Sequence, residues 1–244
     1  MSIKKIALVT GANKGIGFET VRQLAKQGTT VLLGARDEKR GSEAAEKLKG
    51  EGLDVQFLQL DVNNTASQDS AAKFIADKFG KLDILVNNAG VAHDYRVPAS
   101  QGTLEQWRNT FETNMFNLVS LTQKLLPLIK ESDAGRIVNL TSILGSLTLN
   151  TDPKSPIAAA SSSGTAYNAS KAALNMFTVH LANELKSTSI KVNAAHPGWV
   201  KTDMGGEQAP MELADGAKTS VWLATLPEDG PTGGYFHLGE PLPW

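Results

Sequence analysis

Runs of apolar residues recur along the chain, and stretches of mixed polar and apolar character separate them. Several runs, such as KKIALVT at 4–10 and TTVLLGA at 29–35, are continuously apolar instead of alternating. Such runs are typical of parallel strands that are covered on both faces. The predicted strands are 4–10, 29–35, 55–61, 82–89, 136–142, 190–196 and 233–239.

The stretches between these strands have the pattern of helices. The predicted helices are 16–27, 39–50, 67–79, 104–130, 167–186 and 212–224. Alternation of strand and helix predicts a doubly wound α/β sheet with right-handed crossovers. No linker rich in proline or glycine divides the chain, so we expect one Rossmann-type domain over 1–244 with about seven strands. The one biased segment, 148–165, is rich in Ser, Ala, Pro and Thr and is predicted to be a loop.

Composition narrows the classes of function. A formal net charge of −1 without a basic block gives no support to binding of nucleic acid or of a membrane surface. The absence of cysteine excludes a disulfide framework and thiol chemistry. No apolar run approaches the roughly 18 residues of a membrane span, and the first residues lack the apolar run of a signal peptide. We therefore expect a cytoplasmic protein.

A glycine-rich turn, TGANKGIG at 10–17, joins the first predicted strand to the first predicted helix. Gly11 permits a tight turn, Gly15 allows close approach of a ligand, and Gly17 allows the helix to pack on the sheet. The helix N-terminus that follows offers free N–H groups to a phosphate. The spacing G-x-x-x-G-x-G differs from the commonest dinucleotide fingerprint, and a purely structural turn is the alternative.

The end of the second strand normally meets the adenosine ribose of a dinucleotide. This chain has Arg36 there, with no acid at 34–35. Arg36 and Lys14 are able to bind a 2′-phosphate through charge-assisted bonds, which favours NADPH. Asp37 is a complication, because it would pair with Arg36 or compete for the ribose. The alternative is that Arg36 is an ordinary surface residue.

Polar residues also follow the third and fourth strands. Asp61 is placed to bond the adenine amino group, and Asn87-Asn88-Ala89-Gly90 closes the fourth strand at the edge where ligands bind in open α/β sheets. Alternatively, the asparagines and the glycine only form a turn. Further along, YNASK places Tyr167 and Lys171 four residues apart, on one face of a helix. An amphipathic helix with this spacing by chance is the alternative.

These motifs together resemble the short-chain dehydrogenase/reductase family. The matches are TGANKGIG, Asp61 in LDV, NNAG, Asn114, Ser142, YNASK and HPGWVKTDM, and they follow the family order. The pair GANKG and GARD resembles the carbonyl-reductase-like branch, which uses NADPH. The resemblance implies an NADP(H)-dependent oxidoreductase that reduces a ketone or aldehyde.

The resemblance also implies roles for single residues. Tyr167 is the general acid in reduction, Lys171 bonds the nicotinamide ribose, Ser142 holds the substrate oxygen, and Asn114 maintains a water chain. For Ser142 a capping role stays open, and for Asn114 that of an ordinary helix residue. The candidate cofactor residues are Gly11, Asn13, Lys14, Gly15, Ile16, Gly17, Arg36, Asp61, Val62, Asn88, Ala89, Gly90, Tyr167, Lys171, Pro197, Gly198, Val200 and Thr202.

Electrostatics supports the tyrosine–lysine pair. A phenol has a pKa near ~10, too high for ready proton exchange at neutral pH. A cation at roughly 5 Å stabilises the phenolate by about 3 kcal/mol at an effective dielectric of 20. We therefore expect Lys171 to lower the pKa of Tyr167 by about two units.

The spacing between Ser142 and Tyr167 is longer than the commonest one in the family, and 148–165 accounts for the excess. We expect this insertion beside the substrate mouth, as a gate or as a shield that keeps the protein monomeric, so the oligomeric state stays open. Candidate pocket residues suggest an apolar carbonyl substrate; they are Val91, His93, Ile143, Leu144 and Trp199.

Other classes of function have less support. The four histidines form no ligand-spaced pair, so we predict no metal site, and no G-x-S-x-G elbow indicates a serine hydrolase. Two alternatives remain. One is an NAD-linked alcohol dehydrogenase that works in the oxidative direction. The other is a non-catalytic dinucleotide-sensing module with the same fold.

Overall fold

The computed structural model describes residues 4–160 and 162–244, so residues 1–3 of the predicted domain and residue 161 of the predicted loop lie outside it. Eight strands form one sheet in the order β3-β2-β1-β4-β5-β6-β7-β8. The strands are β1 Ile6–Thr10, β2 Thr30–Ala35, β3 Val55–Gln59, β4 Ile84–Asn87, β5 Arg136–Leu140, β6 Lys191–Ala195, β7 Tyr235–His237 and β8 Glu240–Pro241. In this order all neighbouring strands from β3 through β1 to β7 pair in parallel, and β8 pairs antiparallel with β7. This order confirms the doubly wound fold class.

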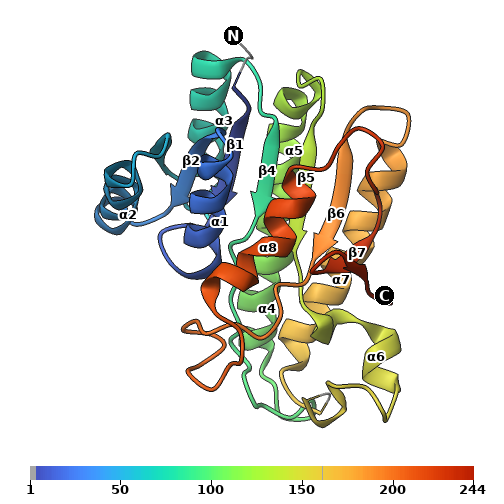
Figure 1. The fold of residues 1–244 in the computed structure, drawn as a ribbon. Coiled ribbons are helices and arrows are strands. Elements are labelled where there is room, and N and C mark those ends of the chain that lie inside the picture. The colour runs from blue at the N-terminus through green and yellow to red at the C-terminus, as the bar shows by residue number, and fades with distance from the viewer. Residues whose placement is uncertain (1–3, 161) are drawn as a thin grey trace.

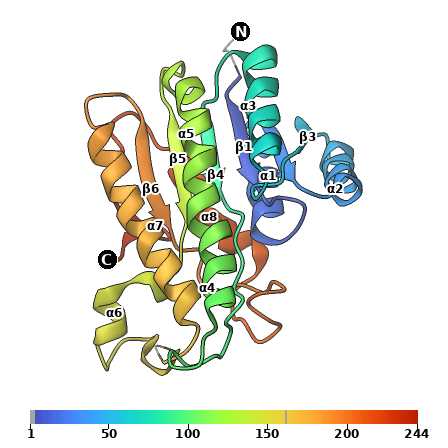
Figure 2. The same ribbon diagram turned by 180° about the vertical axis from the view of Figure 1, so that it is seen from behind.

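Helices cover both faces of the sheet. They are α1 Gly15–Lys26, α2 Glu38–Gly50, α3 Thr65–Phe79, α4 Leu104–Phe111, α5 Asn117–Lys130, α6 Leu147–Thr151, α7 Thr165–Glu184 and α8 Leu213–Ala224. Helices α1 and α8 lie in front of the sheet in Figure 1, and α3, α5 and α7 lie in front of it in Figure 2. Every residue of β1, β2 and β5 is buried, as the continuous apolar runs predict.

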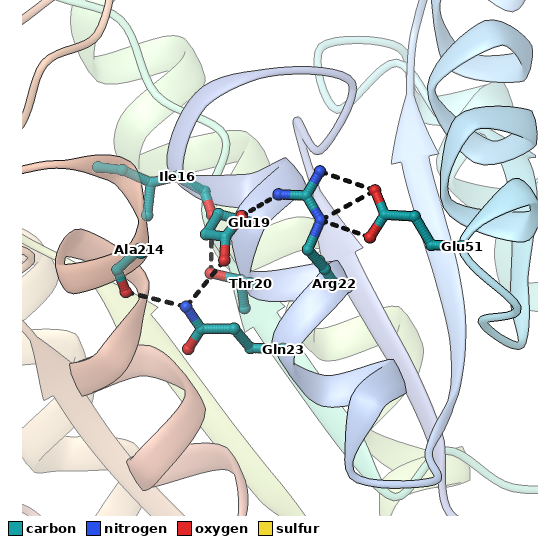
Figure 3. Close-up of polar contacts among 7 residues, drawn as sticks. All are labelled: Ile16, Glu19, Thr20, Arg22, Gln23, Glu51 and Ala214. Atoms are coloured by element: carbon teal, nitrogen blue, oxygen red, sulfur yellow. Dashed lines mark hydrogen bonds and ion pairs between the residues drawn. The ribbon is translucent and has the colours of Figure 1, made fainter.

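Polar side chains on α1 hold this helix against its neighbours (Figure 3). The guanidinium of Arg22 donates to Glu51, with an Nε–Oε2 distance of 2.9 Å, and also pairs with Glu19. The amide of Gln23 donates to the carbonyl of Ala214 in the first turn of α8, at 2.9 Å. Because α1 begins in the glycine turn, these bonds also fix the helix N-terminus at the edge of the sheet.

The predicted helix over 104–130 is confirmed in its range, but its hydrogen-bonding pattern changes in the middle. Helix α4 ends at Phe111, a π-helical turn occupies Glu112–Phe116, and α5 begins at Asn117. A π turn is rare and is often found at functional sites. Asn114 lies in this turn, and its side chain is fully buried and hydrogen-bonded to other segments. Those bonds favour the bulge over a regular turn, and an apolar pattern does not reveal them.

The prediction of a loop over 148–165 is wrong at its beginning. Helix α6 starts at Leu147, and its N-cap Ser146 accepts a hydrogen bond from the backbone N–H of Leu149, at 3.1 Å. A short 3₁₀ turn follows at Ala158–Ala160. Serine at an N-cap is a recognised start signal for a helix. Here the proline-rich composition downstream obscured that signal.

The seventh predicted strand is shorter than expected and leads into an additional strand. Leu238 and Gly239 both have positive φ, of 49° and 89°. This turn reverses the chain, so that β8 pairs with β7. The sheet therefore has eight strands where about seven were predicted. A two-residue strand with a proline lies below the length that an apolar pattern can reveal.

Candidate active site

The predicted site residues gather at the carboxyl edge of the parallel strands, the lower edge of the sheet in Figure 1. Thr10, Asn87, Leu140 and Ala195 end β1, β4, β5 and β6 at this edge. Helix α7 begins near the same edge and carries Tyr167 in its first turn. In open α/β sheets, ligands bind outside the carboxyl ends of the strands.

The glycine turn and the NNAG segment hold each other in place. Gly11 has a φ of 62°, and a Cβ there would lie 3.0 Å from the Cα of Ala89. A Cβ on Gly17 would lie 2.4 Å from Nδ2 of Asn88. The Thr10 hydroxyl accepts the backbone N–H of both Asn88 and Ala89 at 3.0 Å, and Nδ2 of Asn88 donates to the Thr10 carbonyl at 2.7 Å. Side chains larger than glycine at positions 11 and 17 would therefore disrupt the packing of the glycine turn on the NNAG segment. These two packed segments are here called the glycine platform.

The start of α1 fits the phosphates of a dinucleotide. Lys14 is the N-cap residue of α1, and its side chain makes no capping hydrogen bond. The first N–H groups of a helix attract anions unless a side chain satisfies them. Asn13 and Ile16 flank Lys14 and Gly15 in the same turn and are partly buried. The residues present therefore suit a cradle for a pyrophosphate.

Asp37 does not pair with Arg36. Its side chain accepts the backbone N–H of Arg40 at 2.8 Å, and it is the N-cap of α2. Arg36 is exposed, and in residues 4–160 and 162–244 it forms no ion pair. Lys14 instead forms an ion pair with Asp203, and both side chains are largely exposed. The anion-binding role of Arg36 and Lys14 stays a prediction.

The end of β3 and the segment after it form the predicted adenine side of the site. Asp61 accepts the backbone N–H of Asn63 through Oδ1, at 3.0 Å, and its own N–H donates to the hydroxyl of Ser67. Val62 is partly buried and lines a cavity of about 10 Å³ together with Ala89. Asp61 retains a second carboxylate oxygen at the edge of the sheet.

The segment after β6 returns toward the glycine turn. Pro197 precedes Gly198, which has a φ of 90° and leaves no room for a Cβ because the Met211 sulfur would lie 2.1 Å away. Val200 is buried, and the methyl of Thr202 would lie 3.7 Å from a Cβ on Gly15. Thr202 therefore lies close to Gly15, at the opposite end of the predicted cofactor site.

Ser142, Tyr167 and Lys171 lie next to one another. The Ser142 hydroxyl accepts the backbone N–H of Leu144 at 3.3 Å, and its polar group also acts to lower the pKa of the Tyr167 phenol. Nζ of Lys171 lies 5.6 Å from the centre of the Tyr167 ring and donates to the carbonyl of Leu140 at 2.9 Å. A Cβ on Gly90 would lie 3.5 Å from Nζ of Lys171, so the NNAG segment borders the same centre.

The pKa values in this centre differ from the expectation. Burial raises the pKa of Tyr167 to about 12, and the hydrogen bond from Ser142 opposes this rise only in part. Burial also lowers the pKa of Lys171 to about 8. The prediction that Lys171 lowers the pKa of the phenol is therefore wrong for this structure. The physical reason is that desolvation of the phenolate dominates, while the ammonium of Lys171 donates to the carbonyl of Leu140.

Asn114 connects three segments of the site. Its side chain forms two hydrogen bonds of 2.9 Å with the backbone of Val91 and donates to the hydroxyl of Ser170 at 3.0 Å. The Ser170 hydroxyl in turn donates to the carbonyl of Tyr167 at 2.7 Å. Asn114 is thus not an ordinary helix residue on the surface. Its role in a water chain stays a prediction.

Comparisons with known proteins decide the family. The family model for short chain dehydrogenases matches residues 5–213. The chain belongs to the short-chain dehydrogenase family. It is 36% identical to carbonyl reductase (NADPH) 1 of Mus musculus, over 100% of this chain and 99% of that protein. It is 33% identical to (+)-neomenthol dehydrogenase of Capsicum annuum, over 97% of this chain and 96% of that protein.

Solved structures agree with this placement. The NADPH-bound carbonyl reductase from chicken fatty liver has a TM-score of 0.84 at 29% identity, covering 99% of both chains. Salutaridine reductase from Papaver somniferum has a TM-score of 0.83 at 34% identity, covering 96% of this chain and 99% of that one. This dehydrogenase is an oxidoreductase of the carbonyl-reductase-like branch, as the motifs suggested.

Several residues that no sequence motif marks also shape the dehydrogenase site. His196 accepts the backbone N–H of Ile143 through Nδ1, at 3.2 Å, and its ring lies 4.9 Å from that of His237. Burial and the neighbouring His237 lower the pKa of His196 to about 3, so the ring is neutral. Asp94 is 2% exposed and contacts the backbone of Tyr167. These contacts join residues far apart in the chain, which motif spacing does not reveal.

A cavity of about 270 Å³ lies between the segments that follow β4 and β6. It is lined by Ala92, Tyr95, Asp203, Met204, Gly205 and Gly206. Trp199 is 55% exposed, and its indole N–H donates to the carbonyl of Gly205 at 2.7 Å. Trp199, one of the five predicted pocket residues, therefore contacts a residue that lines this cavity.

The described residues contain no group of three or more His, Cys, Asp or Glu side chains able to hold a metal ion. None of their helices has both the length and the apolar character needed to cross a membrane.

Proposed function

We propose that this chain, as one NAD(P)-binding domain, reduces a ketone or aldehyde to an alcohol, with Tyr167 as the general acid. The observation that carries this proposal is that Nζ of Lys171 lies 5.6 Å from the centre of the Tyr167 ring, while the Ser142 side chain acts on the same phenol by lowering its pKa. These three groups adjoin the glycine platform. A proton donor, a second hydrogen-bond donor and a cofactor cradle therefore share one site.

Reduction uses Tyr167 in its protonated form. With a pKa of about 12, Tyr167 keeps its proton at neutral pH and is present as an acid. When bound, the reduced nicotinamide supplies a hydride to the substrate carbonyl. The Ser142 hydroxyl orients the carbonyl oxygen, and Tyr167 donates its proton to that oxygen as its negative charge grows. The alcohol dehydrogenase alternative would use the same groups in reverse, with Tyr167 as the base, and the relatives named for NADPH favour reduction.

The cofactor is NADP(H), the one for which the related carbonyl reductases are named. Arg36 is the proposed partner of the 2′-phosphate, because Asp37 is already engaged as the N-cap of α2. Lys14 is the proposed second partner, and it would exchange its ion pair with Asp203 for the phosphate. The two cations then account for a preference over NADH.

The substrate class is an apolar carbonyl compound. The aromatic side chains Tyr95 and Trp199 and the thioether of Met204 are 65%, 55% and 47% exposed beside the cavity. Exposed apolar side chains that border a cavity mark a binding surface. Relatives named for neomenthol and salutaridine support the assignment of bulky apolar carbonyls to this wall.

The test combines a cofactor comparison with one variant. NADPH and NADH are each incubated with the protein and a panel of aliphatic and aromatic ketones, aldehydes and quinones, and oxidation of the cofactor is followed by absorbance. We expect turnover with NADPH and at least a 100-fold loss of kcat in Tyr167→Phe. The variant should bind NADPH as the wild type does, because only the transferable proton is removed. Binding without turnover across the panel would instead support the dinucleotide-sensing module.

A further inference from the structure

The first turn of α7 has no cap of its own. Gly164 is the N-cap residue, with a φ of 69° and no side chain, and Tyr167 is the third residue of the helix. The first turn of a helix has free N–H groups and frays when they are not capped. A proton donor in this turn is therefore poorly fixed by α7 alone.

A distant carboxylate supplies the missing cap. Oδ2 of Asp94 accepts the backbone N–H of Ala166 at 2.6 Å, and Oδ1 accepts that of Tyr167 at 3.2 Å. N-cap side chains normally bond one of these two positions, and Asp94 bonds both. The negative charge also lies at the positive end of the helix dipole.

Asp94 is buried where it makes this contact. The residue is 2% exposed, and among the described residues no lysine or arginine forms an ion pair with it. Burial of a carboxylate without a cation is unfavourable unless hydrogen bonds compensate for lost hydration. The compensating hydrogen bonds come from the two backbone N–H groups in the first turn of α7.

The segment around Asp94, residues 91–98, is here called the strap. Its Val91 is bonded to Asn114, and the carbonyl of Val97 accepts the N–H of Gly164 at 3.0 Å. Pro98 forms an antiparallel bridge with Ser163. The strap therefore contacts the residues on both sides of the helix start, and it also lines the cavity through Tyr95.

We propose that Asp94 is the positioning residue of Tyr167. Its carboxylate holds the first turn of α7 so that the phenol stays within reach of Ser142, and the strap links that turn to the substrate cavity. This role rests on the proposed function of Tyr167 as the acid. Asp94 touches neither substrate nor phenol oxygen and acts only through the backbone.

The experiment compares three variants. Asp94→Ala removes both acceptors, and Asp94→Asn keeps one. Asp83→Asn is the matched control, because Asp83 is 3% exposed and accepts the N–H of Ile6 at 2.8 Å at the opposite edge of the sheet. For each variant we measure kcat, the KM for NADPH, the isotope effect with 4-deuterated NADPH and the thermal midpoint.

We expect Asp94→Ala to lose about 100-fold in kcat, as for a misplaced catalytic group, with the KM for NADPH unchanged. Asp94→Asn should lose about 10-fold, since one amide remains bonded. The isotope effect should rise toward its full value, because the chemical step becomes rate-limiting. Asp83→Asn should lower the thermal midpoint and leave kcat unchanged. If Asp94→Ala does not fold, the comparison of Asp94→Asn with Asp83→Asn decides.

Hydrogen exchange provides a readout that does not depend on turnover. The peptide covering residues 163–171 should exchange faster in the Asp94 variants and not in Asp83→Asn. If the wild type reduces no carbonyl, the proposed function fails, and the exchange data still decide whether Asp94 caps the helix. Unchanged exchange, a kcat within two-fold of the wild type, or an equal kcat loss in Asp83→Asn would each overturn the proposal.

Discussion

At the scale of single residues, catalysis and stability make opposite demands on Lys171. The side chain is 4% exposed, and burial lowers its pKa to about 8. A buried ammonium costs stability, yet at pH 7 it supplies the positive charge that faces the ring of Tyr167. This loss of stability falls on a residue of the candidate active site, as expected where function takes precedence over stability.

The lowered pKa of Lys171 predicts that both the stability and the reductive kcat change with pH. The folded pKa of Lys171 lies below its ordinary 10.5, so between about 8 and 10.5 the unfolded chain holds a proton that the folded chain has lost. The contribution of Lys171 to stability therefore increases as pH rises through this window, while reductive kcat falls above about pH 8. Stopped-flow rates and thermal midpoints across this range measure both trends.

The matching variant is Lys171→Met. It should raise stability at pH 7 by about 1–3 kcal/mol, because the buried charge is gone, and it should lower kcat and remove the fall near pH 8. Tyr167 and His196, with pKa values of about 12 and 3, do not titrate in this window. A profile that keeps its fall in the variant would assign the step to another group.

A second residue-scale prediction concerns cofactor preference. Arg36→Ala should weaken NADPH binding by about 10-fold, the low end for an exposed charge-assisted bond, and leave NADH unchanged. Arg40→Ala is the control, since Arg40 is an exposed arginine on the next turn and lies 4.0 Å from Asp37. Fluorescence titration with both cofactors separates the cases, and equal losses for NADPH and NADH would contradict the assignment.

At the scale of elements, the amino edge of the sheet carries stability and the carboxyl edge carries the site. Arg136 begins β5 and is 1% exposed, and its guanidinium donates to the carbonyls of Leu226 at 2.8 Å, Pro227 at 3.1 Å and Ser189 at 3.1 Å. It thereby joins β5 to the segments after α8 and before β6.

This division predicts a stability change without a catalytic one. Arg136→Met leaves several buried carbonyls without donors, so we expect a loss of about 2–4 kcal/mol, or a thermal midpoint roughly 5–15 °C lower. kcat at low temperature should be unchanged. Arg108→Met, on the exposed surface of α4, serves as the control. A large kcat loss in folded Arg136→Met would contradict the separation of the two edges.

Sequence patterns predicted the elements that local rules control. The strands and helices lie within a few residues of their predicted ranges, because continuous apolar runs and periodic helices are local signals. The π turn at Asn114 and the cap of α7 were not predicted, because their causes lie far away in the sequence. Asn114 bonds Val91 across 23 positions, and Asp94 bonds the backbone of Tyr167 across 73. The pKa of Tyr167 was also missed, because a spacing of four residues says nothing about desolvation.

At the scale of the whole molecule, the insertion over 148–165 is anchored at both ends. The N–H of Thr148 donates to the carbonyl of Trp244 at 3.0 Å, and the Ser146 hydroxyl donates to the carbonyl of Pro243 at 2.8 Å. At the other end, Ser163 pairs with Pro98 of the strap. Segments from three distant parts of the chain therefore meet around the insertion (Figure 1).

These anchors favour a gate over an interface shield. Replacing residues 152–160 by two glycines keeps both anchors and removes the middle of the insertion. We expect the KM for bulky carbonyls to change several-fold, with the KM for NADPH and the molar mass unchanged, because gating segments act on substrate entry. Steady-state kinetics and light scattering measure these quantities. A shift from monomer to dimer or tetramer would support the shield, and a variant with unchanged kinetics and mass would make the insertion a neutral one.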